Sequence, residues 1–290
     1  DPSYFNSCNK DGTTPLFAAV QETGCRATPS YMELISYMLE KGAHPDSSAC
    51  SGVYPLDVAV EKNNLEVVKA LLKANANPNT STRRGVGNTP LISAVANKNK
   101  VMVRTLLDAG ADVNLPRSRG NGDSPLHIAS RNFDKDMVQL LLERKANPSQ
   151  VNKEYSLPLH IAASAIQSTS ILNMLLAVPS VAKDVCVADQ LGRSPLHYAV
   201  IAKSNHKKDV LVEHDLLILE AGADVNAVDG MGRVALHYVF GIQALSSPWA
   251  FPHCGNVLPY DPIEDVTKLT SVAGARVDIA DKDGRTPLMM

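Results

Sequence analysis

Apolar residues along the chain form short segments that alternate with longer amphipathic ones, and this pattern predicts pairs of α-helices. In the first pair a short apolar helix begins at Pro15, and a second helix covers about Tyr31 to Lys41, where apolar residues recur at helical spacing. Thr14 is expected to cap the first helix, because its hydroxyl oxygen can accept a hydrogen bond from an unpaired backbone N–H group. Gly42 is expected to end the second helix, since glycine adopts the left-handed conformation found there.

A Pro-Leu step opens the short helix of nearly every pair. Its first six copies follow one another at intervals of 33 to 40 residues, and such a period indicates a stacked repeat architecture. The copies are Pro15-Leu16, Pro55-Leu56, Pro90-Leu91, Pro125-Leu126, Pro158-Leu159, Pro195-Leu196 and Pro287-Leu288, with Ala235-Leu236 in place of one. The stretch Asp189 to Asn226 carries one complete unit, from an Asp-Gln-Leu-Gly-Arg-Ser-Pro-Leu-His turn to a closing Gly-Ala-Asp-Val-Asn.

On these residues the chain resembles the ankyrin-repeat family over nearly its whole length. The resemblance implies an all-α solenoid of helix-turn-helix units joined by β-turn fingers, with about seven repeats and the start of an eighth. We expect a single array over 1–290, with units near 9–46, 50–79, 84–114, 119–149, 152–185, 189–226, 229–278 and 281–290. Because arrays normally finish with a polar capping unit and the eighth unit stops early, we expect the chain to be a fragment of a longer protein.

Several segments depart from the repeat. Insertions are expected at about 22–29, 80–87, 203–213 and 241–262. The last one is rich in aromatic residues and proline and contains Trp249, so it is either a docking element or a loop that covers its own repeats. Lys145 and Tyr155 stand where glycine is expected, and Lys145 predicts a strained helix end. Asp57 replaces the usual histidine, and an irregular stretch is expected at Val178 to Val187.

Composition excludes several classes of function. The net charge is −2, with Lys+Arg 28 against Asp+Glu 30, so neither nucleic acid nor an anionic membrane is an expected partner. No apolar run reaches the length of about 18 residues that predicts a membrane span, and the first residues do not resemble a signal peptide. The five cysteines are scattered and form no C-x-x-C pair, which favours an intracellular location, in the cytoplasm or the nucleus.

Four histidines follow the Leu of the repeated step, namely His127, His160, His197 and His237. They could form a row of metal ligands or general bases, but they occur once per repeat, whereas a metal site needs several donors that converge. In the ankyrin family the equivalent histidine joins one turn to the next by hydrogen bonds, and the resemblance implies this role here. No catalytic, cofactor-binding or metal-binding residue is predicted, and no cofactor.

Two sets of cations could bind a partner. Arg193, Arg233 and Arg285 share one turn position, and an arginine row can bind acidic peptides, but a solvated turn residue is the favoured interpretation. A second set could present an acidic-peptide site near the third and fourth repeats or be an ordinary solvated surface, and the sequence favours neither. Its members are Arg83, Arg84, Lys98, Lys100, Arg104, Arg117, Arg119, Arg131 and Lys135, opposed by Asp108, Asp112, Asp123 and Asp134.

The resemblance implies a non-catalytic module that binds a protein or peptide on the concave face of the array, as part of a scaffold or adaptor. The alternatives are the substrate-recruiting region of a larger enzyme, such as a tankyrase-like ADP-ribosyltransferase, a ubiquitin ligase or a kinase, and a structural spacer. By family analogy the expected contact residues are Lys10, Asp11, Thr13, Gln21, Glu22, Ser51, Val53, Glu61, Val86, Asn88, Asn97, Asn121, Asp123, Arg131, Asn132, Glu154, Ser164, Leu191, Arg193, Met231 and Arg233, together with Trp249.

Overall fold

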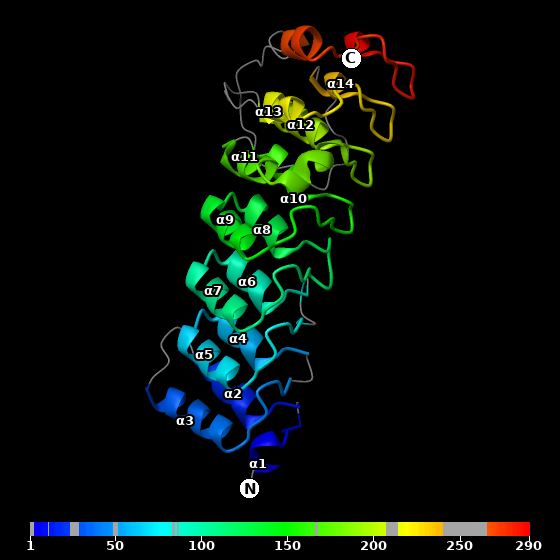
Figure 1. The fold of residues 1–290 in the computed structure, drawn as a ribbon. Helices are drawn as coiled ribbons and strands as arrows, with labels where there is room; N and C mark the ends of the chain where they lie inside the picture. The colour runs from blue at the N-terminus through cyan, green and yellow to red at the C-terminus, as the bar shows by residue number, and fades with distance from the viewer. Residues whose placement is uncertain are drawn as a thin grey trace. The chain divides into compact units, whose positions relative to one another are not determined.

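The computed structural model describes residues 3–10, 12–23, 29–48, 52–82, 85, 87–165, 168–206, 214–239 and 266–290. Over these residues the regular structure is helical, with no strand (Figure 1). The all-α fold expected from the repeats is therefore confirmed. The chain divides into two compact units, which we call unit 1 (Asp1–Ala146) and unit 2 (Asn147–Met290).

Unit 1 consists of a short helix α1 (Ser3–Asn6) followed by paired helices (Figure 1). The first helices of the pairs, called inner helices, are α2 (Pro15–Glu22), α4 (Pro55–Glu61), α6 (Pro90–Ala96) and α8 (Pro125–Arg131). The second helices, called outer helices, are α3 (Pro29–Glu40), α5 (Leu65–Lys73), α7 (Lys100–Asp108) and α9 (Lys135–Glu143). Each inner helix contacts the next inner helix and its own outer helix, so the pairs stack as the repeat pattern predicts.

Local sequence explains where these helices begin. The hydroxyl oxygens of Thr14 and Thr89 accept hydrogen bonds of 3.2 Å from the backbone N–H groups of Phe17 and Ile92, which confirms the predicted cap at Thr14. The proline that follows each cap occupies the first helical position, where no N–H group is needed. Asn64, Asn99 and Asp134 cap the outer helices through side-chain oxygens in the same way.

The core of unit 1 comes from one apolar stripe on each helix. The leucine of every Pro-Leu step is almost fully buried, and one large apolar residue of each outer helix is completely buried. These residues are Leu16, Leu56, Leu91 and Leu126 on the inner helices, and Ile35, Leu71, Leu106 and Leu141 on the outer helices. Because each stripe is covered by the neighbouring pairs, the stability of the unit depends on the contacts between repeats.

Unit 2 continues the same pattern with more variation. Its helices are α10 (Pro158–Ala163), α11 (Ser170–Leu176), a 3₁₀ helix η1 (Pro179–Cys186), α12 (Pro195–His206), α13 (His214–Glu220), α14 (Ala235–Val239), a π-helical turn η2 (Lys268–Val272) and a 3₁₀ turn η3 (Pro287–Met289). The inner helices α10, α12 and α14 contact one another in turn, and α14 contacts η3. The outer helices α11 and α13 pack on α10 and α12 respectively.

Two features of unit 2 differ from expectation. The stretch Val178 to Val187 was expected to be irregular, and this is wrong, since most of it is the 3₁₀ helix η1, which contacts α11 and α12. Pro179 starts η1 because proline suits a first helical position, and Val181 and Val185 are among the buried residues of this helix. Helix α12 continues to residue 206, through the first part of the expected insertion 203–213. The rest of that insertion, all of the insertion 241–262 and parts of 22–29 and 80–87 lie outside the described residues.

The outer helices end in left-handed backbone, which glycine adopts without strain. Gly42, Gly110 and Gly222 have φ of 90°, 88° and 94° at these ends. Lys145 occupies the same position after α9 with φ of 65°, so the strain that the sequence predicts there is confirmed. A side chain in this conformation costs about 1–2 kcal/mol, because its Cβ approaches the following carbonyl oxygen.

Replacing Lys145 by glycine is therefore expected to raise the free energy of unfolding by about 1 kcal/mol. The lysine side chain is exposed, so little packing is lost with it. Urea denaturation of the full chain measures the change. Lys145→Ala is the matched control, since alanine removes the charge and the long side chain but keeps Cβ, and equal stability of the two variants would contradict the prediction.

Candidate interaction site

The chain makes a tight turn before each inner helix, and we call these turns fingers. In unit 2 they are residues 152–156, 189–193, 229–233 and 281–285. The backbone N–H of the first residue donates to the carbonyl oxygen of the fifth at 2.8–3.0 Å in all four fingers. The side-chain oxygen of the first residue accepts backbone N–H groups within the finger, as Asp189 does from Leu191 and Arg193 at 2.8 Å. The backbone of each finger is therefore well fixed.

Successive fingers of unit 2 are joined by single backbone hydrogen bonds. Gln190 donates its N–H to the carbonyl oxygen of Glu154 at 2.8 Å, and Gly230 donates to Leu191 at 2.7 Å. The next bond runs from the N–H of Lys282 to Met231 at 2.9 Å. The fingers consequently lie side by side (Figure 1).

The repeated histidines also connect one finger to the next. Nδ1 of His197 accepts the backbone N–H of Ser194 at 3.2 Å, which leaves Nε2 to donate to the carbonyl oxygen of Arg233 at 3.1 Å. His160 and His237 make the equivalent bonds to Arg193 and Arg285, each at 3.1 Å. The hydrogen-bonding role implied by the family resemblance is confirmed for these three histidines. Burial lowers the pKa of His160 to about 4, so the neutral form that these bonds need prevails at neutral pH.

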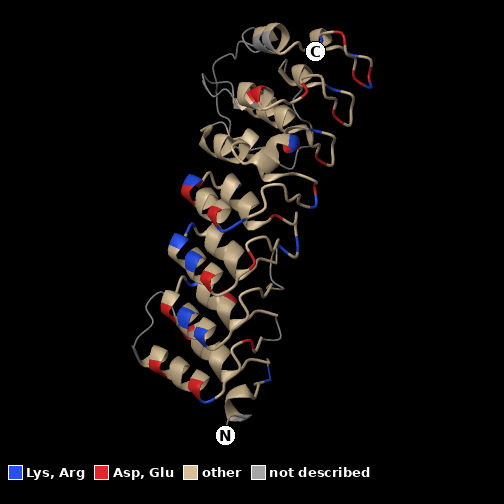
Figure 2. Cartoon of the chain, in the orientation of Figure 1, with Lys and Arg blue, Asp and Glu red and all other residues tan. Residues whose placement is uncertain are grey.

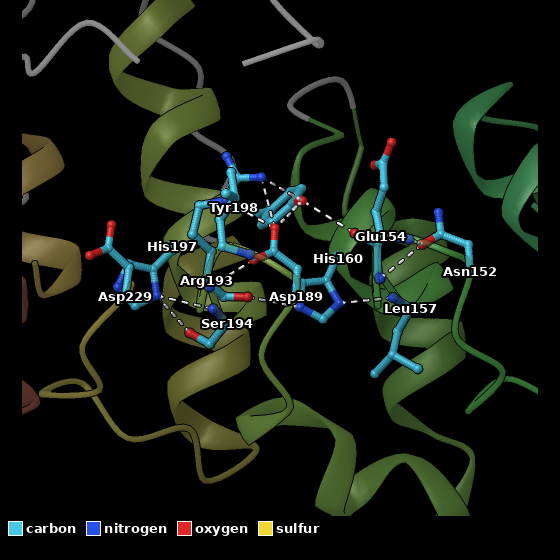
Figure 3. A network of polar contacts seen from close by, with 12 residues as sticks. Asn152, Glu154, Leu157, His160, Asp189, Arg193, Ser194, His197, Tyr198 and Asp229 are labelled. Atoms are coloured by element: carbon cyan, nitrogen blue, oxygen red, sulfur yellow. Dashed lines mark hydrogen bonds and ion pairs between the residues drawn. The ribbon is translucent and has the colours of Figure 1, made fainter. Parts of the chain in front are cut away.

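A buried polar network in unit 2 is centred on Asp189 of the second finger and extends to Ser156 and His160 of the preceding repeat (Figure 3). Oδ2 of Asp189 accepts hydrogen bonds from Nε and Nη2 of Arg193 at 3.0 and 2.7 Å, and from the hydroxyl of Tyr198 at 2.8 Å. The guanidinium also lies over the Tyr198 ring, 4.8 Å from its centroid. Burial alone would raise the pKa of Asp189, but the hydrogen bonds from Arg193 and Tyr198 hold it below its ordinary value. Burial raises the pKa of Tyr198 to about 12.

The other two arginines of the predicted row also meet carboxylates of this chain. Nε of Arg233 lies 3.8 Å from Oδ2 of Asp281, and Nη2 of Arg285 lies 3.2 Å from the same oxygen. Arg285 also pairs with Asp283. The charge of the row is thus largely balanced inside unit 2, which supports the interpretation that these arginines are not an acidic-peptide site.

The predicted contact residues fall into four groups. Those with exposed side chains are Lys10, Gln21, Glu22, Glu61, Asn97, Leu191 and Met231. The half-buried ones are Thr13, Asn88, Asn121, Arg131, Asn132, Glu154, Ser164 and Arg233. Val53, Asp123 and Arg193 are buried and pack within the fold, so we leave them out of the surface proposed below. Asp11, Ser51, Val86 and Trp249 lie outside the described residues.

Comparison with protein families agrees with this architecture. The profile for ankyrin repeats, three copies long, matches residues 2–82, 25–117 and 79–152, and the profile for a single ankyrin repeat matches residues 191–230. The chain belongs to the ankyrin-repeat family. Ankyrin repeats are non-catalytic modules that generally bind other proteins. A comparison with curated proteins finds no significant match.

Two further observations concern the described part of this ankyrin array. No helix there combines the length and the apolar composition that a bilayer crossing requires. Among the same residues, no three His, Cys, Asp or Glu side chains gather in a way that could hold a metal ion.

The predicted contact set did not include Tyr155, although it occupies an unusual place in the array. The residue three positions before the repeated Pro-Leu or Ala-Leu step is glycine with positive φ in the other fingers, for example Gly192 and Gly232 at 76°. Tyr155 holds this position with φ of 58° and is 60% exposed. Leu191 and Met231, at the tips of the next two fingers, are 51% and 43% exposed. The missing glycine was the signal in the sequence that could have identified Tyr155.

Asp57 occupies the histidine position of the second repeat and is buried. One carboxylate oxygen accepts the backbone N–H of Tyr54 at 3.2 Å, as Nδ1 does in the histidine repeats. The other oxygen accepts from the hydroxyl of Thr80 at 3.4 Å. Burial raises the pKa of Asp57 to about 7, so the carboxyl group changes its charge near neutral pH.

The predicted basic set of unit 1 is partly neutralised. Figure 2 shows Lys and Arg interspersed with Asp and Glu over this unit. Lys100 pairs with Asp136, and Arg131 pairs with the buried Asp123. Arg104, Arg119 and Lys135 are exposed, whereas Arg83 and Arg84 lie outside the described residues. Two members of the predicted basic set are therefore neutralised by carboxylates of unit 1.

Proposed function

We propose that this array recognises a partner protein or peptide through the finger tips of unit 2, with Tyr155 as the main anchor. The observation that carries the proposal is the strained backbone of Tyr155. A bulky residue in left-handed conformation persists against a cost of about 1–2 kcal/mol, although glycine fills the same position in the other fingers. Tyr155 is 60% exposed, and residues with a strained backbone occur preferentially at functional positions.

The chemistry of the neighbouring tips supports this role. Tyrosine and other large side chains supply much of the binding energy at protein interfaces, because they bury a large area at a small entropic cost. Tyr155, Leu191 and Met231 are exposed on consecutive fingers, and Val151 and Val228 are exposed beside them. An exposed group of apolar side chains on a soluble protein often marks an interaction site.

The fixed backbone of the fingers is the second requirement. The hydrogen bonds between successive fingers and the three histidine bonds hold the tips in place before a partner arrives. Binding then needs little further ordering of the array, which favours affinity for a given contact area. A partner that presents an apolar side chain to Tyr155 and an extended segment to the next two tips suits this surface.

The decisive variant is Tyr155→Gly, because it should separate stability from binding. We expect it to raise the free energy of unfolding by about 1 kcal/mol, since the strain is removed. Peptides selected by display against the full chain should bind this variant about tenfold more weakly, as expected when an aromatic anchor is lost. Fluorescence anisotropy with the selected peptides measures the affinity, and urea denaturation measures the stability.

Lys145→Gly is the matched control, because it relieves strain of the same kind at a helix end without changing a finger tip. It should gain stability and keep its affinity. Val101→Ser, on the exposed side of α7, controls for the loss of an exposed apolar side chain elsewhere. Unchanged affinity in Tyr155→Gly, or a failure to select any peptide, would contradict the proposal.

A surface of this kind suits the binding part of a larger scaffold or adaptor, and an enzyme could use it equally to recruit substrates. Cys8 and Cys186 are free and exposed in the described residues, which supports a reducing compartment and hence an intracellular location. The identity of a captured partner would distinguish a scaffold from an enzyme's recruiting region.

A further inference from the structure

Unit 1 contains a group of cations around one buried carboxylate, and we call Lys98, Arg117 and Arg131 the basic cluster. Asp123 is completely buried at the base of a finger. Arg131, at the end of α8, pairs with its Oδ2 through Nη1, and Nδ2 of Asn121 donates to the same oxygen at 2.8 Å. The carboxylate of Asp123 therefore already has an ion pair with Arg131 and a hydrogen bond from Asn121.

Arg117 adds a second guanidinium that this carboxylate does not bind directly. Its backbone N–H donates to the carbonyl oxygen of Asp123 at 3.0 Å, which places Arg117 on the opposite side of the finger base. Its Nε is buried and has no hydrogen-bond partner in the described part of the chain. Burial lowers the pKa of Arg117, the charge of Asp123 opposes this effect, and the charge of Arg131 adds to it. The guanidinium of Arg117 thus lies near that of Arg131, and its buried Nε makes no hydrogen bond to the described residues.

Lys98 brings a third cation to the same end of α8. It follows the end of α6, and its Nζ donates to the carbonyl oxygen of Asn132 at 3.2 Å. Asn132 is the residue directly after Arg131, so the ammonium group lies next to the helix end from which Arg131 extends. Even with Asp134, which caps α9 two residues after Asn132, the three cations outnumber the carboxylates, so the net charge of the basic cluster is positive.

The geometry points to a docking point for an acidic side chain, Asp or Glu, of the partner protein at the basic cluster. A carboxylate balances the excess charge of the basic cluster, because guanidinium groups attract carboxylates and bind them in a paired geometry. A nucleic acid fits less well, since its affinity depends on many phosphate contacts and the whole chain has a net charge of −2. This inference rests on the proposed function and adds the chemistry of the partner at unit 1.

The variants must remove the unused charge without exposing the buried one. Arg131 is unsuitable, because its loss would break the ion pair of the buried Asp123. Arg117→Gln and Lys98→Gln avoid this problem. Arg104→Gln is the matched control, because Arg104 is an exposed cation on the outer helix α7 and the change in charge is identical. The probes are a short fluorescein-labelled polyglutamate peptide and a polyglutamine peptide of equal length.

We expect the full chain to bind polyglutamate more tightly than polyglutamine in fluorescence anisotropy at low salt. Arg117→Gln should weaken polyglutamate binding about tenfold, as expected for the loss of a charged hydrogen bond, and Lys98→Gln about threefold. Arg104→Gln should change it less than about twofold, since an isolated exposed charge contributes little. Thermal denaturation checks that the three variants are folded.

Equal losses in Arg117→Gln and Arg104→Gln would overturn the inference, because they would show a response to net charge alone. Equal affinity for the two peptides, or no measurable affinity for polyglutamate, would overturn it as well. The proposed function has a separate readout, namely the effect of Tyr155→Gly on the display-selected peptides. Loss of affinity there together with no effect of Arg117→Gln would reject the acidic docking point and leave the finger-tip site intact.

Discussion

Asp57→Asn is expected to make the full chain more stable by about 3–4 kcal/mol at pH 8, and to leave its stability nearly unchanged at pH 4. Asp57 is 2% exposed, and its pKa is raised from 3.8 to about 7, chiefly because burial disfavours the charged form. A shift of one unit corresponds to about 1.4 kcal/mol. Asparagine keeps an oxygen for the N–H of Tyr54 and offers an N–H group to the Thr80 hydroxyl, so the hydrogen bonds survive.

The sign of the effect follows from the direction of the shift. The folded chain holds the proton of Asp57 more tightly than the unfolded chain does. The free energy of unfolding is therefore highest below pH 3.8 and falls progressively as pH rises to about 7. Urea denaturation of both chains between pH 4 and pH 8 should therefore give two curves that diverge as pH rises. Glu33→Gln, at an exposed carboxylate on helix α3, is the matched control. A gain that is equal at both ends of this pH range would show that ionisation of Asp57 is not its cause.

Arg193→Met is expected to destabilise the chain by about 3 kcal/mol, because removing one partner of a buried ion pair leaves the other charge uncompensated. Asp189 accepts five hydrogen bonds, two of them from the Arg193 side chain. The side chain of Arg193 is 11% exposed and that of Asp189 is 2% exposed, so solvent does little to screen the remaining carboxylate. Methionine has a similar length and packs in place of the aliphatic stem.

Arg285→Met is the matched control, since Arg285 makes the same pair with Asp281 two fingers further along but its side chain is 42% exposed. Its loss should reduce the free energy of unfolding less than the loss of Arg193 does, because Asp281, whose side chain is 1% exposed, keeps a second cation, Arg233, at 3.8 Å. Adding Asp189→Asn to Arg193→Met should recover part of the stability, because the buried charge is removed. Equal losses at the two arginines, or no recovery in the double variant, would contradict this account of the network.

Short-range signals in the sequence predicted much of the fold. The cap at Thr14, the helix starts at the Pro-Leu steps and the strained end at Lys145 all depend on residues within one turn, and the structure confirms them. The family resemblance also implied the hydrogen bonds of His160 and its counterparts. A buried imidazole at a fixed place in a repeat meets the same backbone group each time, which is why the implied role carries over. The 3₁₀ helix η1 was missed because its formation depends on packing against α11 and α12.

The candidate site was harder to predict, because exposure and pairing depend on residues far apart in the chain. Val53 and Asp123 occupy finger positions that carry contact residues by analogy, yet both are buried. Lys98 and Arg117 belonged to a set of nine cations in the sequence, and only the hydrogen bonds around Asn132 and Asp123 distinguish them from the rest. The sequence showed that Tyr155 replaces the glycine of the repeat, but it did not show how far the side chain is exposed or which φ the residue adopts.

The bonds between fingers also determine where copies of this repeat could be exchanged between proteins. A Cβ atom on Gly230 would lie 2.8 Å from the carbonyl oxygen of Leu191, and one on Gly192 would lie 2.5 Å from the nitrogen of Gly230. The contact between the finger 189–193 and the finger 229–233 therefore requires glycine at positions 192 and 230. At the contacts on either side, Gln190 and Lys282 donate the equivalent backbone hydrogen bond although they carry side chains. A chimaera assembled from this chain would best be cut at those two places, leaving the pair between them as a single building block.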